Sequence, residues 1–479
     1  MVDWHFQAEN VIDFAWFTSP AFRHEKYSGV VAGQNKVDLN VYYDPRDSVL
    51  WSKAGVYAAR ALEFYSDWLG AYPYQQMSVV SAPLSAGGGM EYPMVAQIGY
   101  MEDSASLDLV IAHEIGHTWL YGILANNERA HPWMDEGLNS FIEAQYTAKY
   151  QPAYREAYLP REYTTRASMD QVDALQHALH FSNTLQPPAT SPESQQQAQY
   201  FFSAYTMPAQ GLQMMMGMEG EEVMKKMFRQ YFADHQFSHV TPAHLSNSFE
   251  QACDCDLSWY FDGWIHHAHE IDYRISHFDR EKKEVTFVNH GPADIPLRFN
   301  TYKDGQQIRE HTLNGFKGEK TIHLDHRADE IHLYEGFMGV NRHWSSNINP
   351  RSLIPRFGFM PKIESYRSPT IGITPAFGYN LADGFMAGVA LSSGLLPRQH
   401  FKFVVAPLYG KKSKKIRGYA NFRYINDLKS GPFDKFLLSL AFDDFGYNLD
   451  THYLFRDHYF RREPTVAFRL KPTDTNSKI

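Results

Sequence analysis

The spacing of apolar residues predicts a mostly helical region between residue 49 and about residue 267, preceded by short strands. Alternating apolar and polar residues predict short strands in residues 1–48. Apolar residues at helical spacing predict a helix over Val49–Leu69, and a strand follows at Met77–Ala82. Helical spacing then dominates from Leu107 to about His267. We therefore expect a mostly helical domain with a small β-sheet.

The spacing changes again after Ile271, where short alternating runs are separated by turn residues. These runs predict a small antiparallel β-domain over residues 270–335. Residues 362–479 contain longer aromatic runs between Gly, Asn and Asp turns, which resemble the hairpins of an outer-membrane barrel. A soluble β-sandwich explains these runs equally well. About six strands are visible, whereas a closed membrane barrel needs at least about eight, so this barrel-like region is expected to be truncated.

Length and charge narrow the functional classes. The 479 residues exceed the usual size of one domain, so two or three domains are expected. The formal net charge of −9 argues against a nucleic-acid partner, because nucleic-acid-binding surfaces are usually basic. The chain lacks both an apolar run long enough for a transmembrane helix and the features of a signal peptide at its start. We expect it to begin inside a larger protein.

A histidine pair around residue 115 is the strongest chemical signal. His113 and His117 lie four residues apart in VIAHEIGHTW, so on a helix they share one face and can bind one Zn²⁺. Glu114 lies beside these ligands without being one of them. It can therefore accept a proton from a water molecule at the metal.

Glu136 supplies the third ligand that such a site needs. It follows His117 after 18 residues, in HPWMDEGLNSF. A helix, a loop and a second antiparallel helix would return its carboxylate to the histidines. Three protein ligands leave one position open, as catalytic zinc sites require, so one Zn²⁺ per chain is expected. Asp135 could orient a ligand, although a surface or capping acid is the simpler interpretation.

A glycine-rich loop precedes these motifs. Gly87–Gly89 follow the strand predicted at Met77–Ala82, and Met90 and Glu91 come next. Glycine lets the backbone approach a ligand closely, so Glu91 could point a carboxylate into the cleft. Taken alone, the segment is explained better by a flexible loop with a solvated glutamate.

The combination of GGMEYP, HEIGH and a glutamate 18 residues later resembles the M1 family of zinc aminopeptidases, which are gluzincins. In that family the loop reads Gly-x-Met-Glu-Asn, and its glutamate binds the free α-amine of the substrate. The resemblance assigns this role to Glu91, although Tyr92 replaces the usual Asn. It also implies that the substrate lies against Gly88, Gly89 and Met90.

The same resemblance implies a tyrosine that donates a hydrogen bond to the tetrahedral intermediate. The segment FSAYTMPAQGL places this residue at Tyr205, with Met207 where the family has Lys. The implied fold is α+β and multidomain, with a thermolysin-like, mostly helical catalytic domain. The expected domains are the remnant of an N-terminal β-domain (1–48), the zinc peptidase (49–269), the antiparallel β-domain (270–335) and the barrel-like region (362–479).

The expected activity is removal of N-terminal residues from peptides that have a free N-terminus. Two alternatives remain. One is an endopeptidase that uses the same zinc site, and the other is an envelope binding or assembly protein with a vestigial peptidase domain. The complete set of ligands and base argues against the second, because a decayed site usually loses one of them. The barrel-like region and the resemblance suggest the cell envelope or periplasm, with outer-membrane association through the C-terminal region.

Overall fold

The computed structural model describes two compact units of the chain. The first contains the described residues up to 333, and the second contains those from 355 onward. The described residues are 5–85, 88–152, 186–195, 197–267, 271–333, 355–359, 370–394, 400–428, 431–446 and 458–470.

The first unit begins with a five-stranded sheet in the order β1-β2-β3-β5-β4. Its strands are β1 (Arg23–Ala32), β2 (Asn35–Tyr43), β3 (Gln76–Ser81), β4 (Gly89–Tyr92) and β5 (Val95–Ile98). The pairs β2–β3 and β3–β5 are parallel, whereas β1–β2 and β4–β5 are antiparallel. The strands of the predicted N-terminal segment thus continue into the sheet of the next segment, across the boundary predicted at residue 48.

Helices make up most of the rest of this part. The helix predicted over Val49–Leu69 is present, with a short break at Ser52 and Lys53. Residues 153–185, which belong to the predicted helical stretch, lie outside the described residues. The α-helices are α1 (Ser48–Trp51), α2 (Ala54–Leu69), α3 (Ser104–His117), α4 (Leu138–Tyr150), α7 (Gln197–Phe201), α8 (Met207–Glu219), α9 (Glu221–His235) and α10 (Pro242–Cys253).

Several π-helical turns adjoin these helices, and short 3-10 turns lie at Pro45–Asp47 (η1) and Pro192–Ser194 (η4). A π turn closes hydrogen bonds five residues apart, which adds one residue to a helical turn. The π turns are η2 (Thr118–Ile123), η3 (Trp133–Gly137), η5 (Phe202–Thr206) and η6 (Trp259–His266).

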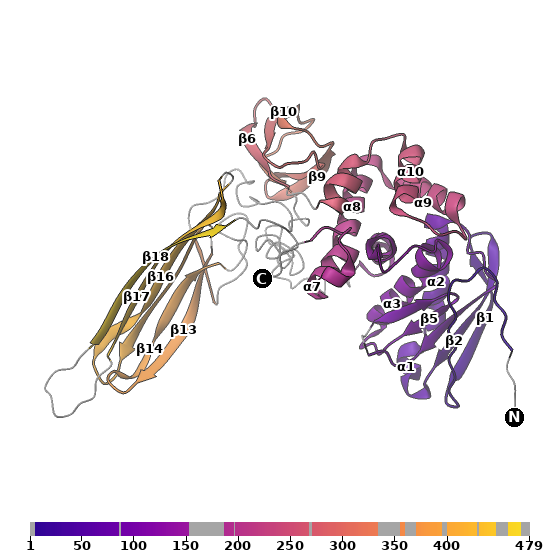
Figure 1. Ribbon diagram of the computed structural model, residues 1–479, viewed down its shortest axis with the longest axis horizontal. Helices are drawn as coiled ribbons and strands as arrows, with labels where there is room; N and C mark the ends of the chain where they lie inside the picture. Colours follow the sequence, from indigo (N-terminus) through magenta and orange to yellow (C-terminus); the bar gives the residue numbers. More distant parts are fainter. Residues whose placement is uncertain are drawn as a thin grey trace. The chain divides into compact units, whose positions relative to one another are not determined.

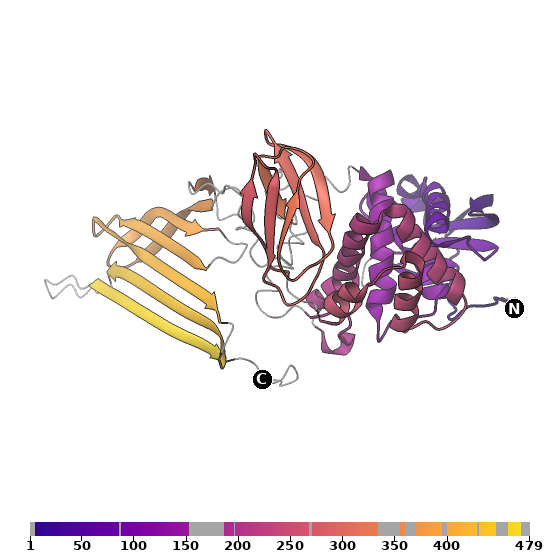
Figure 2. The same ribbon diagram turned by 90° about the horizontal axis from the view of Figure 1, so that it is seen from above.

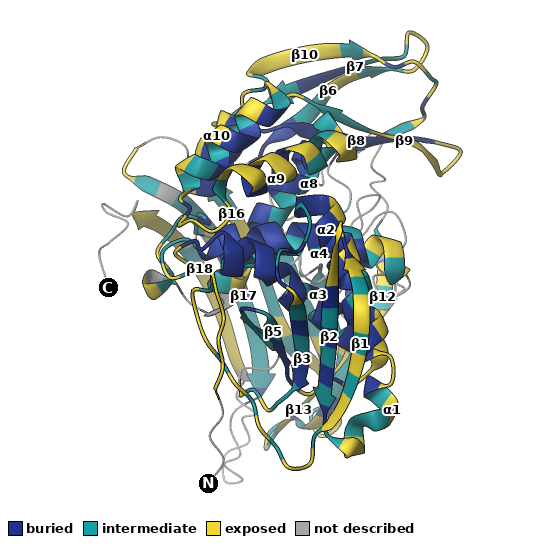
Figure 3. Ribbon diagram, turned by 90° about the vertical axis from the view of Figure 1, so that its right-hand side faces the viewer, coloured by how far each residue is buried: buried dark blue, intermediate teal, exposed yellow. Residues whose placement is uncertain are grey.

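The core of this part lies between the sheet and its helices. Helices α2 and α3 pack along the sheet (Figure 1), and α2, α3 and α4 are largely buried (Figure 3). Aromatic rings fill the space between α2, α4 and α9. Phe228 stacks on Phe141 with ring centroids 5.7 Å apart, and Trp68 meets both rings edge-on. This packing fixes α4 against α2 and thus positions one side of the candidate site.

A small antiparallel β-domain follows, as the alternating sequence predicts. It contains two three-stranded sheets, with the orders β10-β7-β6 and β11-β8-β9. Phe287 and Phe299 meet between the two sheets, with ring centroids 4.9 Å apart. The strands are β6 (Tyr273–Asp279), β7 (Glu284–Asn289), β8 (Leu297–Lys303), β9 (Gln306–Leu313), β10 (Gly318–His323) and β11 (Glu330–Leu333).

The second unit is a single seven-stranded sheet within the described residues (Figure 2). Its strands pair in sequence order and are antiparallel, except that β12 and β13 are parallel. The described strands form an open sheet with β12 and β18 at its edges, so the predicted barrel-like closure is not confirmed. The strands are β12 (Arg356–Phe359), β13 (Thr370–Asn380), β14 (Gly384–Ser393), β15 (Phe401–Gly410), β16 (Lys415–Asp427), β17 (Phe433–Gly446) and β18 (His458–Leu470).

A disulfide bond lies where α10 ends. Cys253 and Cys255 form this bond, although helical spacing predicts that they face apart. The reason is that Asp254 adopts a left-handed conformation, which ends the helix between them.

None of the described helices combines the length and the apolar character needed to cross a membrane.

Replacing Phe228 by alanine should destabilise the first unit strongly. Phe228 is fully buried, and removing its ring leaves a cavity between Phe141 and Trp68. A change of this kind costs about 3–5 kcal/mol of unfolding free energy. Urea unfolding followed by tryptophan fluorescence would measure the loss. Val56→Ala, on the exposed side of α2, is the control and should change stability by less than about 0.5 kcal/mol. Equal midpoints for the two variants would contradict this account of the core.

Candidate metal centre

Helix α3 positions the first two candidate ligands. Asp103 caps its start by accepting hydrogen bonds from the backbone N–H groups of Ala105 and Ser106, both at 2.8 Å. Its last turns carry His113 and His117 on one face, as the sequence predicts. The Nε2 atoms of these two rings lie 3.0 Å apart.

The turn η3 brings Glu136 to the same point. Its Oε2 atom lies 3.2 Å from Nε2 of His113 and 3.2 Å from Nε2 of His117. A tetrahedral zinc ion with bonds of about 2.0–2.1 Å separates its ligand atoms by about 3.3 Å. The three atoms already form a triangle of nearly this size, and two imidazoles and one carboxylate are a donor set that zinc prefers. These residues therefore fit a zinc ion.

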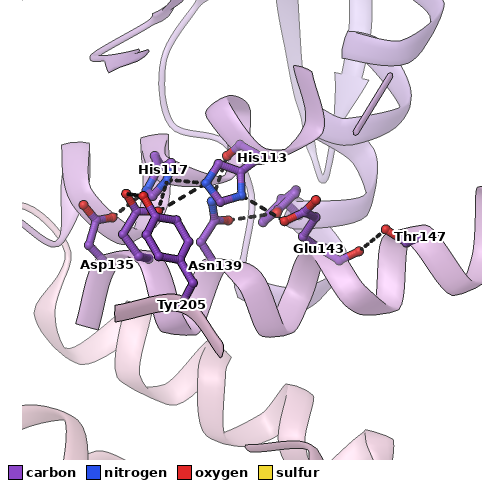
Figure 4. Close-up of polar contacts among 9 residues, drawn as sticks. His113, His117, Asp135, Asn139, Glu143, Thr147 and Tyr205 are labelled. Carbon is purple, nitrogen blue, oxygen red and sulfur yellow. Dashed lines mark hydrogen bonds and ion pairs between the residues drawn. The ribbon is translucent and has the colours of Figure 1, made fainter. Parts of the chain in front are cut away.

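A carboxylate contacts the Nδ1 atom of each imidazole ring, on the side opposite the Nε2 atoms (Figure 4). Nδ1 of His117 lies 2.5 Å from Oδ1 of Asp135, and Nδ1 of His113 lies 3.0 Å from Oε2 of Glu143. Each carboxylate can accept a hydrogen bond from the Nδ1–H group, which leaves the Nε2 lone pair free for a metal. Asn139 adds a contact from α4, because its Nδ2 atom donates to the backbone carbonyl of His113 at 2.9 Å.

The charges around the two rings favour a cation. Burial lowers the pKa of His113, but hydrogen bonds to Glu136 and Glu143 outweigh burial and raise this pKa to about 10. Burial also lowers the pKa of His117, and the charges of Asp135 and Glu136 raise it well above its usual value. The carboxylates therefore stabilise positive charge between them, whether protons on the imidazoles or a metal ion carry it.

Glu114 lies beside the three ligands and is almost completely buried. Its Oε2 atom receives no hydrogen bond from any of the described residues. Burial raises the pKa of this carboxyl to about 7, and the charges of His113 and His117 oppose the increase. A carboxyl group with a pKa near neutrality can both accept and release a proton at neutral pH.

The predicted glycine-rich loop reaches the same place. A Cβ atom on Gly89 would lie 2.5 Å from the Glu114 side chain, so a larger residue here would displace that side chain. Gly88 has φ +71°, a conformation that favours glycine, while Gly87 lies outside the described residues. Met90 and Glu91 follow in β4, and a carboxylate oxygen of Glu91 lies within 4.8 Å of ligand atoms of His117 and Asp135.

Tyr205 lies in η5 on another side of the ligand triangle (Figure 4). Its hydroxyl donates a hydrogen bond of 2.6 Å to Oε1 of Glu136, the oxygen that does not face the histidines. Burial, followed by the charge of Glu136, raises the pKa of Tyr205, so the phenol keeps its proton. The structure thus brings all the sequence-predicted site residues that it describes into one region, and their functional roles remain predictions.

Two side chains of α4 were missed by the sequence reasoning. Glu143 and Asn139 contact His113, although nothing in the local sequence marks them as polar partners. Their spacing from Glu136 is the available signal. Positions three and seven residues after Glu136 lie on one face of a helix, so a ligand at Glu136 predicts that these two residues face the same centre.

Comparisons with known proteins agree with this geometry. Residues 56–264 match the family described as the peptidase family M1 domain. This part of the chain is similar to an M1 domain. Its bounds include every candidate ligand, Glu114, the glycine-rich loop and Tyr205, so the predicted resemblance is confirmed at the level of the family.

Relatives of the M1 domain are distant and much longer. Aminopeptidase N of Lactobacillus helveticus is 22% identical over 222 residues, which cover 43% of this chain and 26% of that protein. Endoplasmic reticulum aminopeptidase 1 of Homo sapiens is 24% identical over 283 residues, covering 54% and 29%. The chain therefore spans only about a quarter of the length of these relatives.

A solved structure supports the fold. The crystal structure of Legionella pneumophila aminopeptidase A in complex with aspartic acid matches with a TM-score of 0.52 and 15% identity. The match covers 67% of this chain and 38% of that one. It supports a mixed α/β, multidomain architecture, as expected from the sequence.

Replacing Glu143 should weaken metal binding without removing a ligand. Glu143→Ala loses the acceptor that orients the His113 ring, and such a loss typically weakens metal affinity by about 10–100-fold. Glu143→Gln keeps an acceptor oxygen without the charge and should show a smaller loss. Competition with a zinc chelator would measure both affinities. Glu63→Ala, an exposed position on α2, is the matched control. An unchanged affinity in Glu143→Ala would refute the orienting role.

Proposed function

We propose that this chain is a zinc-dependent aminopeptidase that removes N-terminal residues from peptides with a free N-terminus. The M1 domain and its aminopeptidase relatives support peptidase activity of this type. The geometry around His113, His117 and Glu136 supports the metal, and the position of Glu91 supports recognition of the amine.

The unpartnered Oε2 atom of Glu114 is the observation that carries the proposal. A buried carboxylate oxygen without a hydrogen bond costs free energy, so such an atom requires an explanation. Here the carboxyl group is close enough to His113, His117 and Glu136, whose ligand atoms are arranged for one ion, to feel their charges. A base that binds a water molecule during the reaction needs a free acceptor atom at this place.

His113, His117 and Glu136 would hold the zinc ion, while Asp135 and Glu143 would keep the rings in the correct tautomer. When bound, the ion would polarise the scissile carbonyl and make a water molecule easier to deprotonate.

Glu114 performs the proton transfers in this mechanism. It accepts a proton from the attacking water and passes it to the nitrogen of the leaving amine, so the protein regains its initial state. Tyr205 keeps its hydroxyl proton and can donate a hydrogen bond to the carbonyl oxygen as negative charge develops there. A donor placed in this way typically lowers the barrier by about 3 kcal/mol.

Glu91 would determine where the peptide is cut. The free α-amine of a peptide is cationic at neutral pH and would bind the Glu91 carboxylate. Because Glu91 lies so close to His117 and Asp135, an amine bound there would place the first peptide bond at the metal. A peptide substrate that extends beyond Glu91 towards its own N-terminus would have no cationic amine there to bind the Glu91 carboxylate.

Changing Glu114 to glutamine should abolish catalysis and keep the metal. Glutamine has nearly the same shape but cannot accept the proton, so turnover should fall by roughly two to four orders of magnitude. Hydrolysis of amino-acid anilides would measure the rate, and elemental analysis would measure bound zinc. Near-normal turnover in a zinc-loaded variant would rule out Glu114 as the base. His117→Ala provides the contrast, because it should lose the zinc as well as the activity.

Removing either partner of the amine contact should weaken catalysis by a similar factor. A charge-assisted hydrogen bond is worth about 1.5–3 kcal/mol, so Glu91→Ala should lower kcat/KM by roughly one to two orders of magnitude. N-acetylation of a good substrate should cause a loss of similar size with the unmodified enzyme. The two changes combined should add little, because both remove the same ion pair. If acetylated peptides are cut internally as fast as free ones, the chain is an endopeptidase and Glu91 has no selective role.

A further inference from the structure

The seven-stranded sheet of the second unit has two chemically different faces. The strand register identifies the residues that share a face, because alternate residues along a strand point to opposite sides. We call the apolar face the side that carries Phe377, Val389, Tyr409, Leu440 and Val466. The polar face is the opposite side. It carries Thr374, Ser392, Arg423, Ser439 and Glu463.

The apolar character extends across the width of the sheet. In one row, Phe403 pairs with Phe422, which pairs with Leu440, which pairs with Pro464. Four successive strands thus contribute only apolar side chains to this row. Such continuity across strands shows a surface with one chemistry, not isolated apolar residues.

Large side chains on this face are exposed. Phe377 is 68% exposed and Val466 is 60% exposed, whereas the core of the first unit is almost fully buried. Most of the exposed large apolar residues in the described strands of this sheet lie on the apolar face. The exceptions are Val404, Tyr419 and Tyr459. An exposed apolar surface of this extent marks a contact with another apolar partner.

Asp444 and Arg462 are charged residues on the apolar face, and both have partners. Asp444 accepts a hydrogen bond of 2.7 Å from Arg417. The guanidinium of Arg462 lies 4.7 Å from the ring centroid of Phe460. Both residues are near the end of the sheet where β17 ends and β18 begins. The rest of the face offers an apolar band towards the other end.

We propose that the apolar face contacts the acyl chains of a lipid bilayer, with the polar face turned to water. The strands β13 to β18 contain 10 to 14 residues. A strand of about 9–11 residues, tilted by about 45°, spans the hydrocarbon layer of a bilayer. The alternation of apolar and polar residues, clearest along β16 and β18, is the pattern of strands with lipid on one side and water on the other.

Charge at one end of the sheet complements a lipid surface. The turn between β15 and β16 exposes Lys411, Lys412 and Lys414, and Lys415 begins the next strand. Lys412 also donates to the backbone carbonyl of Leu381, which ties this turn to the neighbouring one at 2.7 Å. Lysines at this end would lie at the level of the headgroups, where anionic lipids attract them.

Lipid contact sets a condition for the edge strands. The outer backbone groups of β12 and β18 have no strand partner in the described sheet, and hydrocarbon cannot satisfy such groups. In the bilayer these edges would therefore have to pair with further strands, such as those of a second copy.

Labels on adjacent residues of β18 provide a test on the full chain. Val466 lies on the apolar face and Ala467 on the polar face, and both are exposed. Val466→Cys and Ala467→Cys would each carry an environment-sensitive dye, because the native cysteines are paired with each other. With vesicles of phosphatidylcholine and phosphatidylglycerol, the dye at position 466 should shift to the blue. Bromine atoms on the acyl chains should quench it several-fold more than the dye at 467.

Equal quenching at the two positions would overturn the proposal. A dye at position 466 that is already blue-shifted without vesicles, and that brominated lipid does not quench, would show instead that protein covers the face. Absence of binding to the vesicles would also overturn it. Peptide hydrolysis by both variants should match that of the unmodified chain, because neither position belongs to the metal centre. This readout separates the proposal from the peptidase function.

Neutralising the basic turn tests the predicted orientation. Lys411→Gln combined with Lys415→Gln should weaken binding to vesicles that contain phosphatidylglycerol and leave binding to pure phosphatidylcholine unchanged. The effect should diminish in high salt, because ions screen exposed charges. An equal loss on both kinds of vesicle would contradict a headgroup contact at this end of the sheet.

Discussion

The burial of two imidazoles on one helix is the constraint on which the rest of the metal centre depends. His113 and His117 face each other at 3.0 Å between their Nε2 atoms, with little access to water. Polar rings buried in this way are costly unless each finds a partner. Asp135 and Glu143 provide these partners, and Glu136 completes the ring of ligand atoms. The turn η3 and helix α4 must therefore pack directly against α3, which determines how the whole helical layer is arranged.

Small residues make this close packing possible. A Cβ atom on Gly116 would collide with the side chains of Asn139 and Tyr65, so α4 and α2 can approach α3 only because this position is glycine. Gly89 plays the same part for the strand that passes Glu114. Tyr65 in turn donates a hydrogen bond of 2.8 Å to Asn139. The glycine inside the histidine motif thus serves the packing of the helices, whereas its neighbours serve the chemistry.

The sequence predicted the parts of the structure that depend on local spacing. The ligand face of α3 follows from helical periodicity, and Glu136 follows from its distance along the chain. The contact of Glu143 with His113 follows from the sequence only once Glu136 is taken as a ligand, because that assignment decides which face of α4 turns towards α3. The pairing of β2 with β3 crosses a predicted boundary, since parallel pairing joins segments that are far apart in sequence. The disulfide depends on the left-handed conformation of Asp254, which the helical pattern around it conceals.

The π turns make the number of residues in two segments important for the positions of Glu136 and Tyr205. Glu136 and Tyr205 both lie in turns that hold one residue more than an α-helical turn, and such turns recur at functional sites. The extra residue in η3 affects the position of the Glu136 side chain around the helix axis. Removing one residue from η3, such as Met134, would return the turn to ordinary α-helical winding and change the path of the backbone that carries Glu136. Every ligand would still be present in the sequence, yet Oε2 of Glu136 would lose its present position between the two histidines. Length variation in this segment is therefore as severe a change as the loss of a ligand.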